Sequence, residues 1–189
     1  GEMRRNIDAW SPALERGAEA IVTTASGCGT QVKSYGELLR TDRVYAGKAG
    51  IVAQSTRDMA ELLLAEEDAL LARLGETGGA GGRRVAFHSP CSLQHGQRIT
   101  GAVERLLQAA GYRLVPVADS HLCCGSAGTY SIFEPELSGQ LGDNKVQALL
   151  SGDPGCIATA NIGCLAHIQT RSPVPVVHWI ELIEQVLLP

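Results

Sequence analysis

The sequence predicts an α/β fold with a mostly parallel sheet and helices on both of its faces. Beyond residue 83, short apolar runs typical of buried strands alternate with longer segments of helical periodicity, the pattern of strand–helix–strand units. With 189 residues and 44% apolar composition, the chain is long enough for one α/β domain and elements of a neighbouring one. A glycine-rich stretch between two periodic regions indicates that there are two structural units.

Before the glycine-rich stretch, the helical signal is strongest between Met59 and Leu74, where leucines recur at helical spacing. Ser55 and Asp58 have the spacing expected near the start of a helix with a capping box. The other elements expected here are a helix over 2–16, a buried strand over 20–24 that ends in a turn at 26–29, and a helix over 31–40.

Residues 75–82 contain five glycines. Such a stretch has too much conformational freedom to hold a helix or a strand, so it predicts a flexible linker. We therefore place the boundary at 75–83, between a unit over 1–74 and a unit over 84–189.

The second unit is expected to alternate strands and helices throughout. Gly111 is expected to end its first helix, and Pro135 suits the first turn of its second helix. The stretch 159–164 echoes 23–28 in the first unit, and each follows a predicted strand, which suggests that the two units are related. The expected strands are 84–88, 112–117, 156–160 and 175–177, and the expected helices are 99–110, 135–150, 164–170 and 179–188.

Charge and hydropathy argue against several classes of protein. The net charge of −4, without basic clusters, is unlike a nucleic-acid-binding surface. No apolar run approaches the roughly 20 residues that cross a bilayer, and the first residues lack the core of a signal peptide. We therefore expect a cytoplasmic protein. Structural disulfides are rare in that compartment, so the six cysteines indicate metal or redox chemistry.

The cysteines share a position relative to the predicted strands. Cys28, Cys91 and Cys164 each lie just beyond the end of a strand, and Cys123 and Cys124 lie in the loop after the strand 112–117. Ligands of open parallel sheets bind at the carboxyl ends of the strands. The four cysteines of the second unit are therefore expected to converge, although they are far apart in the sequence.

Thiolates are soft anionic donors that bind iron–sulfur clusters and zinc. The adjacent pair Cys123 and Cys124 is awkward for one tetrahedral ion but suits a cluster, where adjacent sulfurs can reach different irons. Gly125 allows cluster or ligand atoms to approach the backbone closely. Cys156 instead begins a strand at the opposite end of the sheet, and since a free cysteine commonly packs as a small apolar residue, we predict that role for it.

The pattern Cys91-x31-Cys123-Cys124-Gly125-x35-Asn161-x2-Cys164 resembles the cysteine-rich CCG domain family. Domains of this family occur in heterodisulfide reductase and in the iron–sulfur subunits of glycolate oxidase. The segments that are most similar to the glycolate oxidase subunits are 4–10, 26–29, 88–96, 121–131, 159–164 and 175–179.

The resemblance implies that 1–74 is the C-terminal end of a first cysteine-rich domain and that 84–189 is a second, complete one. A ferredoxin-like N-terminal region of the family is missing from this chain. Cys28 would match the last cysteine of the first domain. The resemblance further implies that an iron–sulfur cluster of the 4Fe–4S type is held by Cys91, Cys123, Cys124 and Cys164.

Asn161 stands where the family has the first cysteine of a C-x-x-C pair. Related domains use five cysteines, so the four that remain could hold a simpler cluster or zinc. Asn161 itself could hydrogen-bond a cluster sulfur or a backbone amide. Four histidines, His88, His95, His121 and His178, fall near strand ends or in the loop of the cysteine pair, and each either binds a metal, tunes the centre through a hydrogen bond, or is a satisfied polar group of a loop. We favour His95, four residues after Cys91, and His121, two before Cys123.

The family resemblance implies an electron-transfer subunit of a complex that oxidises glycolate to glyoxylate. The flavin would lie on a partner flavoprotein subunit, the acceptor would be a quinone, and the complex could hold the chain at the inner face of the cell membrane. Two other functions stay open: a structural zinc or assembly module, and a thiol–disulfide enzyme that uses the Cys123–Cys124 pair.

Overall fold

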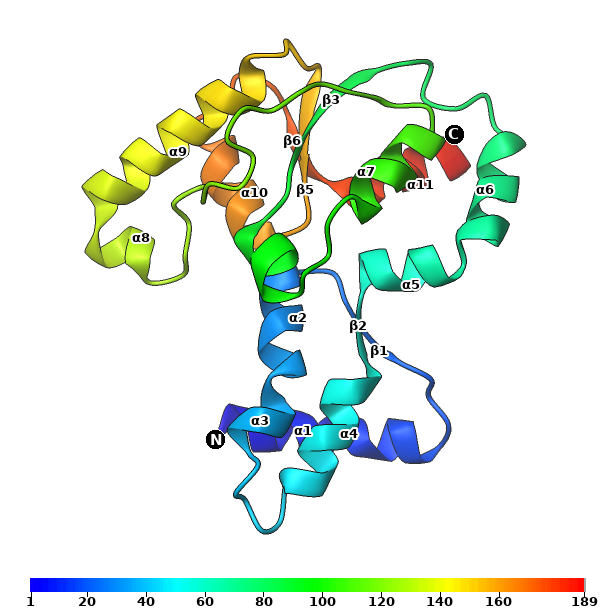
Figure 1. The fold of residues 1–189 in the computed structure, drawn as a ribbon, viewed down its shortest axis with the longest axis vertical. Helices are drawn as coiled ribbons and strands as arrows, with labels where there is room; N and C mark the ends of the chain where they lie inside the picture. The colour runs from blue at the N-terminus through cyan, green and yellow to red at the C-terminus, as the bar shows by residue number, and fades with distance from the viewer. Residues whose placement is uncertain (189) are drawn as a thin grey trace.

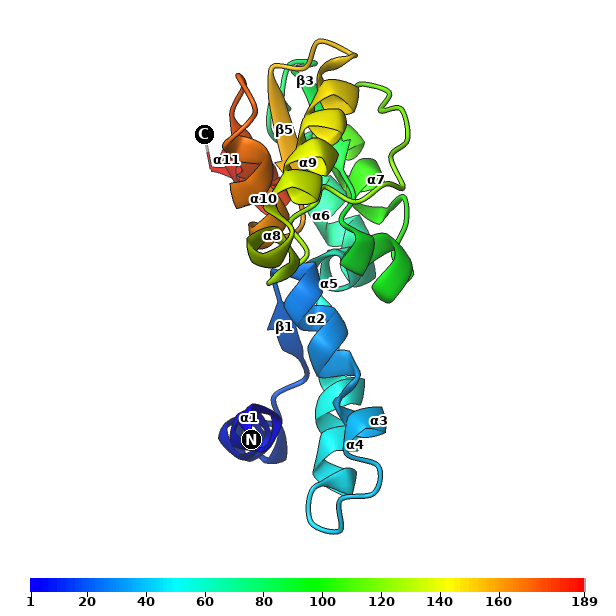
Figure 2. The same cartoon turned by 90° about the vertical axis from the view of Figure 1, so that its left-hand side faces the viewer.

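The structure is a computed structural model that describes residues 1–188, so the last residue of the predicted second unit lies outside it. The molecule is elongated, with a larger lobe built on a parallel sheet and a smaller helical lobe (Figures 1 and 2). A narrow region formed by α2 (Ser26–Lys33), β1 (Ile21–Thr23) and β2 (Thr56–Asp58) joins the two lobes. No helix within 1–188 is long and apolar enough to cross a membrane.

The sheet of the larger lobe has four parallel strands in the order β4-β3-β5-β6. This arrangement confirms the predicted fold class. Because successive side chains of a strand point to opposite faces, each strand contributes to two separate cores. The strands are β3 (Arg84–His88), β4 (Arg113–Leu114), β5 (Cys156–Thr159) and β6 (Val176–His178).

Helices cover both faces of this sheet (Figure 1). The first face packs on one hydrophobic cluster together with α5 (Met59–Ala65), α6 (Glu67–Gly75), α7 (Ala102–Ala109) and α11 (Trp179–Leu187). The second face packs on a cluster together with α9 (Pro135–Leu150) and α10 (Ile162–Gln169). Cys124 and Cys164 belong to the second cluster, so the two most buried cysteines share one face of the sheet.

The smaller lobe has its own core around Ile7, Val32 and Tyr35. The parallel strands β1 and β2 run from this lobe toward the sheet, with Thr23 opposite Asp58 at their ends. Its helices besides α2 are α1 (Glu2–Glu15), α3 (Tyr35–Leu38) and α4 (Ala46–Ser55).

Three local predictions in the first unit are wrong. Residues 26–29 form the first turn of α2, and their glycines serve close packing, since a Cβ at Gly29 would lie 2.6 Å from Thr23 Oγ1. Ser55 ends α4, and the capping box belongs to Asp58 and Glu61 at the start of α5. The strand β1 is only partly buried, because Val22 is 39% exposed.

Two elements of the second unit are shorter than predicted. The strand β4 has only two residues, Arg113 and Leu114. The helix α7 begins at Ala102 and excludes Ile99. The helix α9 has the predicted bounds, with Pro135 in its first turn.

The glycine-rich stretch is fixed against the end of α7 and is not a free linker. Ala80 N donates to Ala110 O (2.9 Å), Gly82 N donates to Gly111 O (3.0 Å), and Ala80 is buried. Gly111 has a φ of +83°, and a Cβ there would lie 2.9 Å from Ala80 N. The helices α5 and α6 pack in the same core as the sheet. The boundary at 75–83 itself stays a prediction.

Candidate metal centre

The candidate centre lies at the carboxyl ends of β3 and β5, on the face that α9 and α10 cover. His88 ends β3 and is paired in register with Thr159, which ends β5. By strand alternation, His88 shares its face with Ala86, a member of the same core cluster as Cys124 and Cys164. A ring nitrogen of His88 and the sulfurs of Cys124 and Cys164 all lie within 4.8 Å of one another, and all three residues are buried.

Cys164 reaches the centre because it is the third residue of α10, which starts directly after β5. The Asn161 side chain caps this helix: its Oδ1 accepts a hydrogen bond from Gly163 N at 2.9 Å. The cap fixes the first turn of α10 at the edge of the sheet. Of the two roles that we expected for Asn161, the hydrogen bond to a backbone amide is therefore present.

Cys124 is fixed by the packing of its loop on α9. Gly125 has a φ of +89°, and a Cβ at this position would lie 2.4 Å from Ser138 O. Ser138 Oγ donates to Gly125 O at 2.9 Å, and Gly125 N donates to Cys123 Sγ at 3.3 Å. The glycine thus permits a close approach to α9, and Cys124 beside it is only 1% exposed.

Four of the cysteines form a row of neighbouring thiols. Burial, followed by the adjacent Cys123 sulfur, raises the pKa of Cys91. A hydrogen bond to Cys124, followed by burial, raises the pKa of Cys123. The hydrogen bond from Cys123 lowers the pKa of Cys124, but Cys164 and burial outweigh it and raise that pKa to about 12. Without a metal, Cys91, Cys123 and Cys124 are protonated at neutral pH, so metal binding to them must release protons.

Cys91 is the exposed end of this row. It follows β3 and precedes η1 (Ser92–Gly96), a single wide turn of π-helix. The segment after it contacts the start of α2: Ser92 Oγ lies 2.8 Å from Ser26 Oγ, and Thr30 Oγ1 donates to Ser92 O at 3.0 Å. The contact positions Cys91 where the two lobes meet.

Lys145 of α9 places a buried positive charge near the thiols. It is 3% exposed, and its Nζ donates to Asp119 O at 2.8 Å and to Ser120 O at 3.4 Å. Burial lowers its pKa, while the charges of Cys124, Asp119 and Cys123 act in the opposite direction. Within 1–188, no carboxylate pairs with this ammonium group. Anionic thiolates would supply the missing counter-charge.

His88 is nearly inaccessible and carries two ring nitrogens that have no hydrogen-bond partner among residues 1–188. Burial lowers its pKa to about 3, with a smaller contribution from the charge of Lys145. The imidazole is therefore neutral near pH 7, the form in which histidine binds metals. His88 is one of the four histidines that the sequence places near strand ends or in the loop of the cysteine pair, and its place in the alternation of β3 is the signal that distinguishes it from the others.

The structure does not bring three of the predicted residues into this group. His95 and His121 are exposed, and a ring nitrogen of His95 lies 3.3 Å from the backbone oxygen of His121. Cys28 is exposed in the first turn of α2. The Nδ2 group of Asn161 lies 3.4 Å from both Ser26 Oγ and Ser92 Oγ, so its amide joins the segments that carry Cys28, Cys91 and Cys164.

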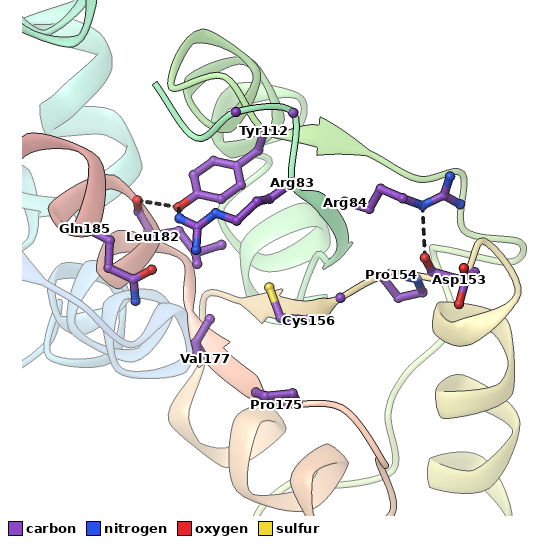
Figure 3. Close-up of a pocket in the computed structure, with 13 residues that line it drawn as sticks. Arg83, Arg84, Tyr112, Asp153, Pro154, Cys156, Pro175, Val177, Leu182 and Gln185 are labelled. Atoms are coloured by element: carbon purple, nitrogen blue, oxygen red, sulfur yellow. Dashed lines mark hydrogen bonds between the residues drawn. The ribbon is translucent and has the colours of Figure 1, made fainter. Parts of the chain in front are cut away.

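A cavity of about 700 Å³ lies at the opposite edge of the sheet, at the amino ends of the strands (Figure 3). Cys156 points into it, and burial raises the pKa of this thiol. Arg83 stacks 5.1 Å from the centre of the Tyr112 ring and donates to its hydroxyl at 2.8 Å. Cys156 is the single cysteine that lines this cavity, and it also packs, partly buried, against the hydrophobic cluster of the first sheet face.

A row of four cysteines beside a buried histidine, at the carboxyl edge of a parallel sheet, defines a thiolate-rich metal- or cluster-binding domain. A comparison with known protein families supports this class of domain. Residues 85–169 match the family model described as the CCG cysteine-rich domain, so this part of the chain is similar to that family.

Similar proteins include components of bacterial oxidases. The chain is 52% identical over 184 residues to the glycolate oxidase iron-sulfur subunit of Escherichia coli K12, an alignment that covers 97% of this chain and 44% of that protein. It is 30% identical over 169 residues to the probable glycolate oxidase iron-sulfur subunit of Bacillus subtilis 168, covering 88% and 36%. Lactate utilization protein A of Geobacillus sp. WCH70 is 27% identical over 172 residues, covering 88% and 70%. The chain thus spans less than half the length of the two glycolate oxidase subunits.

Proposed function

We propose that the chain is part of an iron–sulfur electron-transfer subunit of an oxidoreductase complex. The observation that carries this proposal is the row formed by Cys91, Cys123, Cys124 and Cys164 at one edge of the sheet. A cluster bound there would supply one-electron transfer. The donor set fits such a group, since it offers several soft ligands in a largely buried place, with a histidine whose nitrogens lack partners within 1–188.

The side chains of this region have distinct tasks in the proposal. The four thiolates bind the metal, and the position of Gly125 against Ser138 holds Cys124 in place. Lys145 places a positive charge beside the thiolates, which favours the anionic ligand set. The partial burial of the row limits the access of water, and Cys91 at its exposed end is where electrons would enter or leave.

We further propose that the substrate of the whole complex is glycolate, which is oxidised to glyoxylate at a flavin on a partner subunit, and that a quinone accepts the electrons. The names of the Escherichia coli and Bacillus subtilis relatives support glycolate. The lactate utilization relatives make lactate the principal competing substrate. In this proposal the complex is cytoplasmic and associates peripherally with the inner face of the membrane.

The first test measures iron, acid-labile sulfide and zinc in anaerobically purified protein, with EPR spectra of the same sample. We expect iron and sulfide in matching amounts. The Cys123→Ser variant should lose both, while Cys156→Ser, at the other edge of the sheet, should keep both. Equal cluster content in these two variants would overturn the proposed ligand set.

A structural zinc site is the second candidate function. The group of His88, Cys124 and Cys164 favours it, because histidine and cysteine are the usual ligands of structural zinc and all three atoms lie within 4.8 Å of one another. Stoichiometric zinc without iron or an EPR signal would support this function and would remove the electron-transfer role.

A further inference from the structure

Two polar side chains at the candidate centre are buried without a partner in the described chain. His88 is 2% exposed, and neither of its ring nitrogens has a hydrogen-bond partner within 1–188. Thr159 is fully buried, and its hydroxyl also lacks a partner among these residues. Native proteins rarely leave such groups unpaired, so each one calls for a bound water, ion or ligand.

The two unpaired groups lie side by side. His88 and Thr159 are partners in the register of β3 and β5, and both are the last residues of their strands. His88 shares a face with Ala86, and Thr159 shares one with Ile157, and both of those residues belong to the cluster of Cys124 and Cys164. The unpaired atoms therefore face the same small region as the two buried thiols.

We infer that His88 is a direct nitrogen ligand of the metal centre, together with Cys124 and Cys164. The inference rests on the proposed function, which it deepens by adding a ligand of a different chemical class. The separation of the three donor atoms, 4.8 Å or less, is one that a shared metal or cluster can span. The Thr159 hydroxyl would then donate a hydrogen bond to a ligand sulfur or to the bound group.

Asn161 does not compete for this role. Its Oδ1 accepts from Gly163 N at 2.9 Å, and its Nδ2 lies 3.4 Å from Ser26 Oγ and from Ser92 Oγ. A donor beyond the four cysteines must therefore come from another residue. The buried unpaired groups among the described residues belong to His88, Thr159 and Gln97, and His88 is the one that offers ring nitrogens, the donors that join thiolates at zinc and iron–sulfur centres.

A nitrogen ligand changes the charge of the centre. Imidazole binds as a neutral donor, whereas a thiolate would bring a further negative charge to a site that is already anionic. Replacement of thiolates by histidine raises the reduction potential of iron–sulfur centres. We therefore expect the potential of this centre to lie above that of the same centre in a His88→Cys variant.

The test compares wild type, His88→Cys and His88→Leu, with His95→Leu as the matched control at an exposed histidine. In reconstituted, reduced protein, pulsed EPR should show the strong coupling of a directly bound ¹⁴N nucleus in wild type and His95→Leu. His88→Cys should keep its iron, lose this coupling and shift to a lower potential. His88→Leu should lose most of its iron.

The outcomes separate this inference from the proposed function. If wild type contains iron and sulfide that depend on Cys123, but the ¹⁴N coupling is absent or survives in His88→Cys, His88 is not a ligand and the electron-transfer proposal stands.

If wild type contains zinc alone, the electron-transfer proposal fails, and cobalt substitution then tests His88. An absorption spectrum of the cobalt protein that His88→Cys leaves unchanged would overturn the inference. Circular dichroism of the metal-free variants separates loss of the ligand from loss of the fold.

Discussion

The two strand–helix units of the chain share a design but differ in what surrounds their cysteines. In one, β1 leads to α2 and returns to β2; in the other, β5 leads to α10 and returns to β6. Both place a cysteine at the third helical residue, Cys28 and Cys164. Both end in a capping box, made by Asp58 and His178. Yet Cys28 is exposed and Cys164 is buried.

The neighbouring strand explains the difference. On its other edge β5 pairs with β3, which brings His88 next to Cys164, whereas within 1–188 β1 pairs with β2 alone. The loop that carries Cys124 then covers Cys164 from the side of α9. A cysteine at a strand–helix junction is thus only one part of a metal site, and the remaining donors come from the adjacent strand and loop.

The strongest test of the different roles of Cys28 and Cys164 is to remove each cysteine in turn. Cys164→Ser should lose most of the bound metal, because it removes a buried thiolate beside Cys124. Cys28→Ser should keep the metal content of wild type, since Cys28 is exposed and apart from the group of donors. Metal analysis of the two proteins measures the effect. A comparable loss in Cys28→Ser would show that the first unit completes the centre.

The next largest effect concerns the loop that carries Cys124 and Gly125. Only the second unit has such a loop beside its strand–helix cysteine. Gly125→Ala should lower the free energy of unfolding by about 2–4 kcal/mol, because the added methyl group combines a positive φ with a clash against the Ser138 backbone. Gly101→Ala is the matched control: its φ is +74°, but no atom lies within 4 Å of the added Cβ. It should cost about 1 kcal/mol. Equal costs in urea unfolding would argue against the close packing.

Part of the fold and of the candidate site could be predicted from the sequence. The alternation of strands and helices was sufficient to predict the parallel sheet, and Pro135 marked the start of α9 correctly. The convergence of the cysteines followed from the general rule for carboxyl ends of strands. These features depend on local patterns and on topology, which a sequence carries directly.

Features that depend on contacts between distant segments were not predictable in this way. The glycines of 26–29 suggested a turn, but they allow α2 to pack closely against Thr23 and Asn161. We favoured His95, four residues after Cys91, and His121, two before Cys123. His88, three residues before Cys91, lies at the centre instead, because β3 and β5 are adjacent. Neither fact is visible before the strand order is known.

A smaller difference in the free energy of unfolding is expected between the two capping boxes. Glu61 accepts from Asp58 N at 2.8 Å and also pairs with Lys33, whereas Glu181 accepts from His178 N at 3.1 Å. Glu181→Ala should cost about 1 kcal/mol and Glu61→Ala a few tenths more, since its ion pair is partly exposed. Urea unfolding of both variants tests the order. A larger cost for Glu181→Ala would mean that the cap of α11 dominates.

The smallest expected effect is on pH dependence, where the two capping residues have opposite signs. Burial lowers the pKa of His178, whose Nδ1 accepts from Ile180 N at 3.3 Å and whose Nε2 donates to Thr24 O at 2.8 Å. The unfolded chain therefore binds a proton more readily, and stability falls as pH drops below about 6.5. Burial raises the pKa of Asp58, so its contribution falls as pH rises above about 4.

The variant His178→Asn should retain the cap and lose part of the dependence below pH 6.5. In metal-free protein the remainder comes from His88, whose pKa is also lowered by burial. The free energy of unfolding, measured between pH 5 and pH 7.5 for wild type and variant, checks this expectation. If the free energies of unfolding of the two proteins changed with pH in parallel, the pH dependence would come from groups other than His178.

The row of thiols is graded from surface to interior: Cys91 is exposed, Cys123 is half-buried, and Cys124 and Cys164 are buried. An oxidant or an alkylating reagent that arrives from solvent therefore meets Cys91 first. Oxidation or alkylation would begin at Cys91 and reach Cys124 and Cys164 last, because these two sulfurs stay shielded until the loop opens. In mass spectrometry, the order in which the cysteines acquire a label would thus record how far the site has been dismantled.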